Sequence, residues 1–182
     1  MTIQSAQLLK DLEKLIKQHI LFAEKLQQLP DEQLKQKATS KTWNALECIE
    51  HLNRYGNFYL PEIQKRIKGS NSHGSEIFKS GWLGNYFAKS MWPSAQLNKM
   101  STFKSMNPID SKVERNVLDI FIGQQQTMLK ILQQCELVNL NKIKTNISIT
   151  PLVKLRLGDT LRIVIYHNER HIRQAERATQ LL

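Results

Sequence analysis

Two histidines near the end of the chain have the spacing of a helical metal-binding pair. His167 and His171 are four residues apart in a segment of helical periodicity, so both side chains project from one face of that helix. Two imidazoles at this spacing can hold one metal ion between them. A third ligand from another helix would complete a facial set and leave positions open for water or a substrate.

His51 is the candidate for that third ligand. At about 100° per residue, His51 falls at the edge of the apolar arc of its helix, and His167 and His171 fall at the edge of theirs. Such positions suit a half-buried cleft between two helices. Spacing alone also fits structural or solvated histidines. His19 is interpreted as a packing residue of the first helix and His73 as part of a polar loop.

Four segments of helical periodicity must position these side chains. They cover about residues 4–29, 45–67, 112–136 and 157–181. Asn44-x-x-Glu47 and Ser111-x-x-Glu114 have the form of capping boxes before the second and third helices. Pro61 lies inside the second helix and predicts a kink there.

The segment between the second and third helices, residues 69–110, is too long for a structureless loop in a compact domain. It is also too aromatic for a disordered linker. We expect a packed crossover with a short helix over residues 83–90. Four aromatic side chains are expected either to form one wall of the site or to cap the core: Trp82, Tyr86, Phe87 and Trp92.

The connection over residues 137–156 is expected to be ordered, with one short extended piece. Only 7 Gly and 5 Pro occur in 182 residues, which argues against a sandwich or barrel of many short strands. The predicted fold class is therefore all-α: a four-helix bundle with a long crossover between helices 2 and 3, formed by a single domain over residues 1–182.

The net charge of +10 comes from 26 basic and 16 acidic residues that are spread along the chain. This favours anionic ligands weakly and DNA still less. No stretch approaches the ~20 apolar residues of a membrane span, and the N-terminus lacks the apolar region of a secretory signal. Cys48 and Cys135 do not make a disulfide framework, so a cytoplasmic protein without a membrane partner is expected.

Two segments together resemble a known family. They are TWNALECIEHLNRYGNFYLPEI and, later, LGDTLRIVIYHNERHIRQAER. Both resemble the DinB/YfiT-like superfamily, cytosolic four-helix bundles with a Trp before the second helix, a His within it, and an H-x-x-x-H pair in the fourth helix. The resemblance implies that His51, His167 and His171 bind a divalent metal, zinc or nickel. Family members often dimerise, so a homodimer is the candidate assembly. Better-understood relatives transfer low-molecular-weight thiols or isomerise substrates with them, so the resemblance indicates the site more firmly than the reaction.

Further residues could serve such a site. Glu47 lies one turn before the histidine of its helix and could support it or act as a general base, although the capping box is the favoured interpretation. Gln174 follows the histidine pair by one turn and could orient a ligand or a bound water, or be a plain polar neighbour. Arg170 and Tyr55 are candidate substrate-binding residues, and a solvated cation is the alternative for Arg170. Cys48 is interpreted as a small buried residue rather than a nucleophile or ligand.

These residues predict a metal-dependent enzyme of hydrolase or thiol-transferase type. A divalent metal on three neutral imidazoles keeps its full charge and can activate water or a thiol. We expect a small-molecule substrate, an anionic thiol among the candidates, attracted by the cations Arg170, Lys79, Lys89, Lys99 and Lys104. Two alternatives stay open. One is a non-catalytic metal-binding or interaction bundle, and the other is a nucleic-acid-binding protein, which the charge alone suggests.

Overall fold

The structure is a computed structural model that describes residues 1–93, 102–109 and 111–180. Its elements in chain order are β1 (Thr2–Gln4), α1 (Ser5–Leu26), α2 (Asp31–Lys35), α3 (Ala45–Lys68), β2 (Ile77–Lys79), α4 (Trp82–Met91), the 3₁₀ turn η1 (Lys104–Met106), α5 (Val117–Cys135), β3 (Lys144–Ile147), β4 (Thr150–Arg156) and α6 (Leu157–Thr179). The prediction of an all-α helical bundle is confirmed. Two small antiparallel sheets, β1–β2 and β3–β4, accompany the helices.

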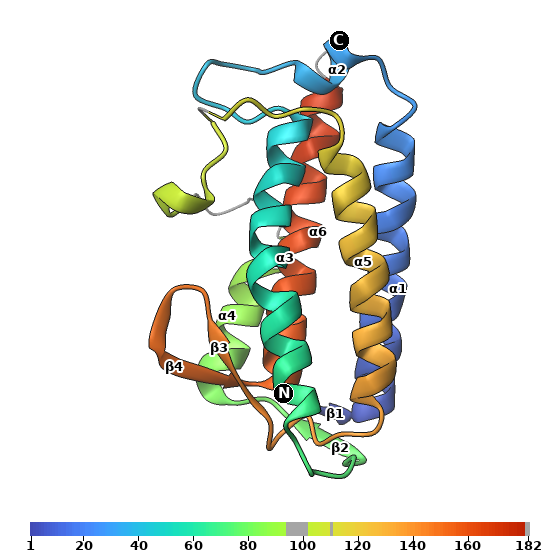
Figure 1. Ribbon diagram of the computed structural model, residues 1–182, viewed down its shortest axis with the longest axis vertical. Coiled ribbons are helices and arrows are strands. Elements are labelled where there is room, and N and C mark those ends of the chain that lie inside the picture. The colour runs from blue at the N-terminus through green and yellow to red at the C-terminus, as the bar shows by residue number, and fades with distance from the viewer. Residues whose placement is uncertain (94–101, 110, 181–182) are drawn as a thin grey trace.

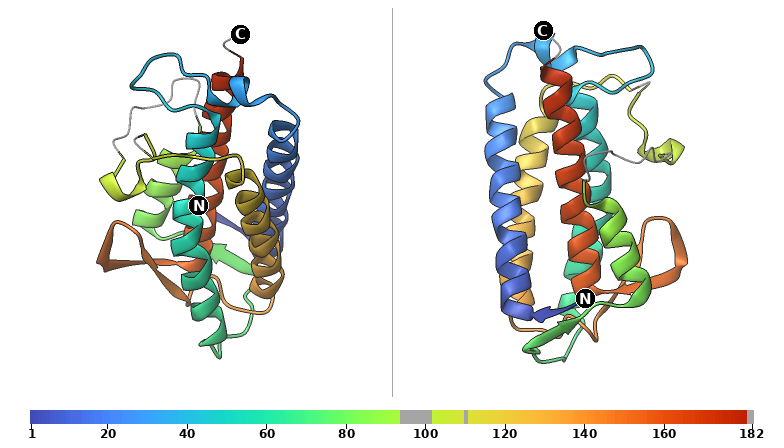
Figure 2. Two further views of the ribbon diagram at one scale, coloured as in Figure 1. Left: turned by 45° about the horizontal axis from the view of Figure 1, so that its top comes forward. Right: turned by 180° about the vertical axis from the view of Figure 1, so that it is seen from behind.

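Four long helices, α1, α3, α5 and α6, lie side by side (Figure 1). The helices α1 and α6 run in one direction, and α3 and α5 run in the other. Because α3 and α5 are parallel neighbours, the chain must return along the bundle between them, and this explains the long crossover. The short helix expected in that crossover is confirmed as α4, which packs on the outer side of α6 (Figure 2).

The bundle core has two apolar clusters with a polar layer between them. One cluster lies around Leu12, Ile63 and Leu161, and the other around Leu46 and Phe121. Between them, each long helix contributes one buried polar side chain: His19, Asn53, Gln125 and Asn168. Buried polar groups need partners. The Asn168 amide donates to Gln125 Oε1 at 3.2 Å, and the Asn53 amide donates to the Val117 carbonyl at 2.9 Å.

The first predicted capping box is confirmed and the second is wrong. The Asn44 side chain accepts from the Glu47 backbone N–H at 2.8 Å, and the Glu47 carboxylate accepts from the Asn44 backbone N–H at 2.9 Å. The third long helix instead begins at Val117, after Asn116, with no side-chain cap. The reason is a long-range contact, because the Ser111 hydroxyl accepts a hydrogen bond from Arg54 at 2.7 Å.

The connection before α6 has more structure than expected. Instead of one extended piece it forms the β3–β4 hairpin, with Lys144 opposite Arg156 and an irregular register beyond Asn146. The helix α3 also continues through Pro61 as one element. Among the described helices, none is long and apolar enough to cross a membrane.

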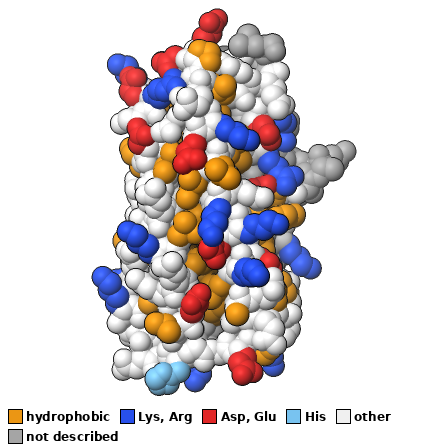
Figure 3. Space-filling view, turned by 90° about the vertical axis from the view of Figure 1, so that its right-hand side faces the viewer, with side chains coloured by type: hydrophobic (Ala, Val, Ile, Leu, Met, Phe, Trp, Pro, Cys, Tyr) orange, Lys and Arg blue, Asp and Glu red, His pale blue; other side chains and the backbone are white. Residues whose placement is uncertain are grey.

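One side of the bundle, formed by α1 and α5, exposes apolar surface. Figure 3 shows this side, on which hydrophobic side chains gather in a band between charged ones. Leu21 of α1 and Ile120 of α5 are among the exposed large hydrophobic residues of the chain. They lie near the same end of the bundle, since Gln27 at the end of α1 donates to Asp119 at the start of α5.

Candidate metal centre

The three candidate histidines converge between α3 and α6. One ring nitrogen from each of His51, His167 and His171 lies within 4.8 Å of the others, and Nε2 of His51 is 3.2 Å from Nε2 of His167. Zinc binds imidazole nitrogen at about 2.0–2.1 Å, so two ligands of a tetrahedral ion are about 3.3 Å apart. The spacing and the nitrogen donor set therefore fit a single divalent transition metal.

Hydrogen bonds at the far side of two rings fix which nitrogen faces the centre. Nδ1 of His51 donates to the Met106 carbonyl at 2.7 Å, and Nδ1 of His171 donates to Gln174 Oε1 at 2.9 Å. With the proton held at Nδ1, each ring turns an unprotonated Nε2 toward its neighbours. Such outer partners are what orient histidine ligands in metal sites.

Aromatic side chains enclose the three imidazoles. The Trp43 ring lies 4.7 Å from the ring of His51 and 5.6 Å from that of His171 between centroids. On the other side, the Tyr55 ring lies 4.9 Å from His51 and 4.7 Å from His167. These contacts keep the rings out of bulk water and limit their rotation.

The surroundings keep all three histidines neutral. Burial lowers the pKa of His51 to about 4 and the pKa of His171 to about 3. Burial, then the two neighbouring imidazoles, lowers the pKa of His167 well below its usual value. Desolvation penalises the charged form of a base, so the rings carry free lone pairs at neutral pH. Neutral imidazole is the form that binds a metal.

The rotation of α6 about its axis is set by the residues between the ligands. Asn168 faces inward to Gln125, and Glu169 reaches α1, where its carboxylate lies 3.2 Å from Nε2 of the buried His19. These contacts tie α6 to α5 and α1. His167 and His171 are thereby turned toward α3.

A comparison with known protein families matches this arrangement. The family model described as the DinB superfamily matches residues 17–175. The chain belongs to the DinB superfamily. Searches of curated proteins and of solved structures gave no match.

The histidines of this DinB-superfamily chain open onto a cavity of about 630 Å³. The residues that line it come from the loop before α3, from α3, α4, the crossover and the β3–β4 turn, and from α6. Its cationic members are Lys41, Arg170 and Arg177, and no carboxylate is present among the described lining residues. The cavity beside the histidines is therefore electropositive.

The other candidate residues differ in their relation to this cavity. Gln174, Arg170 and Tyr55 line it, and Gln174 contacts a histidine directly. Glu47 does not line it: its two carboxylate oxygens are held by the Asn44 backbone and, at 2.7 Å, by the Lys37 ammonium. A role for Glu47 as general base has no support in this geometry, and the capping box accounts for it.

The aromatic residues of the crossover were expected to be buried, and this is wrong for three of them. Trp82 is 86% exposed, Tyr86 is 63% exposed and Trp92 is 43% exposed. Neither these three nor Phe87 line the cavity, and Trp92 packs edge-on against Tyr166 instead. The crossover contributes five other described residues to the lining wall: Met91, Thr102, Phe103, Asn107 and Ile109.

The cations of the cavity also differ from those expected. Lys79, Lys89 and Lys104 do not line it, and Lys99 lies outside the described residues. Lys41 and Arg177 replace them, and sequence analysis missed both. A signal was available for Arg177, which continues the α6 stripe of Arg170 and Gln174 at helical spacing.

Burial makes both cysteines unreactive. The pKa of the buried Cys48 thiol is raised mainly by desolvation, and the pKa of Cys135 is raised to about 12. A thiol needs a lowered pKa to act as a nucleophile at neutral pH. The interpretation of Cys48 as a small buried residue agrees with its place in the core.

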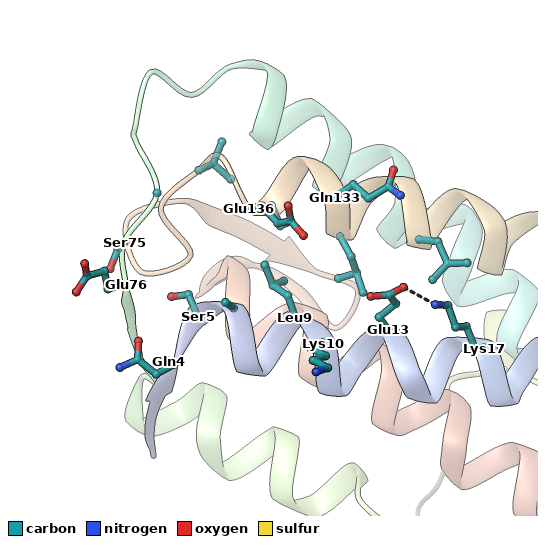
Figure 4. Close-up of a pocket in the computed structure, with 16 residues that line it drawn as sticks. Gln4, Ser5, Leu9, Lys10, Glu13, Lys17, Ser75, Glu76, Gln133 and Glu136 are labelled. Atoms are coloured by element: carbon teal, nitrogen blue, oxygen red, sulfur yellow. Dashed lines mark ion pairs between the residues drawn. The ribbon is translucent and has the colours of Figure 1, made fainter.

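A second, larger hollow lies between α1, α5 and the loop around Ser75 (Figure 4). Lysines and glutamates alternate along it, and Glu13 and Lys17 form an ion pair at 2.6 Å. No histidine is among the described residues that line it. It lacks the converging donors of the site between α3 and α6.

Proposed function

We propose that this chain is a metal-dependent enzyme of hydrolase or thiol-transferase type that acts on a small anionic substrate. His51, His167 and His171 would hold the metal, for which zinc and nickel are the candidates. The observation that carries the proposal is the convergence of three neutral imidazoles at the wall of an electropositive cavity. When bound, the metal supplies a Lewis acid that can lower the pKa of a water or thiol and polarise a substrate oxygen.

The protein's own side chains would bind and orient the substrate. Lys41 and Arg177 place two cations in the wall of the cavity, where they attract an anionic group. Gln174 and the Met106 carbonyl hold protons at Nδ1 of two ligands and so keep the rings in position. Trp43 narrows access of water to the histidines.

Tyr55 would act as a hydrogen-bond donor to the substrate. Burial, and then the nearby Tyr59, raises the pKa of its phenol, which therefore stays protonated at neutral pH. The ring lies against His51 and His167, and the residue lines the cavity. A neutral hydroxyl at this place can donate to a substrate oxygen and stabilise charge that develops there.

Elemental analysis of protein purified without a His-tag tests the metal site. We expect close to one zinc or nickel per chain after loading, and strongly reduced metal in His51→Ala, His167→Ala and His171→Ala. His73→Ala is the matched control, because His73 lies in an exposed loop. Full occupancy in any of the three site variants would overturn the ligand set.

A screen for thiol transfer and ester hydrolysis with the loaded protein then separates an enzyme from a metal-binding bundle without turnover. Retained metal with no turnover in either assay would favour the non-catalytic alternative. Nucleic-acid binding would instead require steep salt dependence of DNA affinity. A cytoplasmic location and a homodimer remain parts of the proposal.

A further inference from the structure

The cavity beside the histidines has two chemically different ends. On α6, the lining residues run from His167 through Gln174 to Arg177, a rise of about 15 Å over ten residues. Arg177 and Lys41 lie toward the end of the bundle where α6 finishes. The histidines lie below them, and Tyr55 is one turn further along the antiparallel α3.

The opposite end of the cavity is apolar. Met91 at the end of α4 and Ile149 in the turn between β3 and β4 line it. Phe103 of the crossover is a further apolar lining residue, nearer to the histidines because it directly precedes the 3₁₀ turn that contacts His51. Figure 1 shows α4 and the hairpin beside the half of the bundle that lies away from the end of α6. These three apolar lining residues come from three separate segments of the chain, and none of them is charged.

Two of these apolar side chains have no structural role in the core. Ile149 and Phe103 are each 52% exposed, and neither belongs to the buried apolar clusters. A single exposed apolar residue is ordinary, but these two line the same cavity as the histidines. Apolar walls with a few placed polar groups are typical of small-molecule sites. A ligand that reaches them would cover apolar surface that the fold leaves in water.

We propose that the substrate is an amphipathic acid. Its carboxylate or phosphate group is held by Lys41 and Arg177, and its hydrocarbon arm lies over Met91, Phe103 and Ile149. This inference rests on the proposed function, because the histidines lie between the two ends and so beside the middle of the ligand. The anionic group is then a recognition group. Arg177 is six residues beyond His171, or about 9 Å along the helix, so the anion lies away from the reacting bond.

Calorimetric titration of the zinc-loaded full chain tests this assignment. The probes are acetate, hexanoate, octanoate and decanoate, with octanamide as the uncharged match for octanoate. We expect affinity to rise up to about fourfold for each methylene that becomes buried, and octanamide to bind at least tenfold more weakly than octanoate. Equal affinities across the acids, or for octanoate and octanamide, would overturn the proposal.

Matched variants assign the two ends. Ile149→Ser and Phe103→Ser should flatten the dependence on chain length and leave acetate binding unchanged. Leu152→Ser is the control, because Leu152 lies on the same hairpin, is 91% exposed and does not line the cavity. An equal effect of Leu152→Ser would show binding to exposed apolar surface in general and would refute the apolar end.

The cationic end has its own pair of variants. Lys41→Gln and Arg177→Gln should each lower the affinity for octanoate about tenfold and leave the affinity for octanamide unchanged. Lys154 is an exposed lysine of β4 outside the cavity, so Lys154→Gln should change neither affinity. Loss of octanoate affinity in Lys154→Gln alone would refute the assignment of the anion to Lys41 and Arg177.

The metal content of each sample keeps the two hypotheses apart. Zinc bound to the histidines with no selectivity for amphipathic acids refutes this inference and leaves the metal site standing. No zinc bound refutes the proposed function. The titration then proceeds on the metal-free protein, in which the same lining residues face the ligand and the same dependence on chain length is expected.

Discussion

Acidification should leave the metal affinity of the three-histidine site almost unchanged from pH 7 down to about pH 5. Protons compete with the metal for each ligand nitrogen, and at pH 5 a histidine with the ordinary pKa of about 6.5 loses about 30-fold in affinity. His51 and His171 have pKa values lowered to about 4 and about 3, so the corresponding loss is about 1.1-fold or less for each. Two ordinary ligands would together lose about a thousandfold.

The same lowered pKa values make the stability of the metal-free protein depend on pH, in contrast to the metal affinity. Below about pH 6.5 the unfolded chain binds protons at these histidines, and the folded chain does not until its own lower pKa values are reached. The free energy of unfolding should therefore fall as the pH drops through this window. Bound zinc should reduce this loss, because it binds the neutral imidazoles of the folded state.

Competition with a chromophoric chelator, corrected for the chelator's own protonation, measures zinc affinity between pH 5 and 7. A peptide of residues 160–178 provides a solvated reference for the histidine pair. We expect a flat profile for the protein and a steep one for the peptide. A decline in the protein that is centred near pH 6.5 and as steep as in the peptide would refute the argument from burial.

Three further predictions concern single side chains. Gln174→Leu removes the acceptor for the Nδ1 proton of His171 and should lower zinc affinity about 10- to 100-fold. Gln174→Glu keeps an acceptor and should retain most of the affinity, so an equal loss in both variants would contradict the orienting role. Glu47→Gln weakens the capping box and should lower the free energy of unfolding by about 0.5–2 kcal/mol, measured by denaturant titration, while zinc affinity stays unchanged. A loss of zinc affinity at unchanged stability would instead make Glu47 a residue of the metal site. If the homodimer uses the α1–α5 side, Leu21→Glu should give a monomer by light scattering while Leu152→Glu does not; a dimer that survives Leu21→Glu would exclude this side as the interface.

The long helices could be predicted because their apolar periodicity is a local property of the sequence. The start of α5 could not, because the hydroxyl of Ser111 is bound by Arg54 from another helix. The β3–β4 hairpin was also missed. Pro151 and exposed lysines interrupt the alternation that marks a strand, and pairing across the turn supplies what the sequence pattern lacks.

The candidate site likewise contains residues that could be predicted from the sequence and residues that could not. The helical pair His167 and His171 follows from spacing, and His51 follows from its place on the second helix together with the family resemblance. The Met106 carbonyl, Lys41 and Ile149 had no comparable signal, because they belong to loops and turns whose position depends on tertiary packing. Roles in catalysis for the lining residues remain predictions.

The stretch from His167 to His171 explains how the bundle can order the proposed metal site before any metal binds. Asn168 and Glu169 face α5 and α1, while the histidines on either side of them face α3. The polar contacts of Asn168 and Glu169 therefore fix the direction in which the two histidine side chains of α6 point. Since those ligands are already neutral and two are already oriented by their Nδ1 partners, little of the binding free energy has to be spent on ordering the site. It follows that loss of the inward contact between Asn168 and Gln125 should weaken the metal site, although the Asn168 side chain faces α5 and not the site itself.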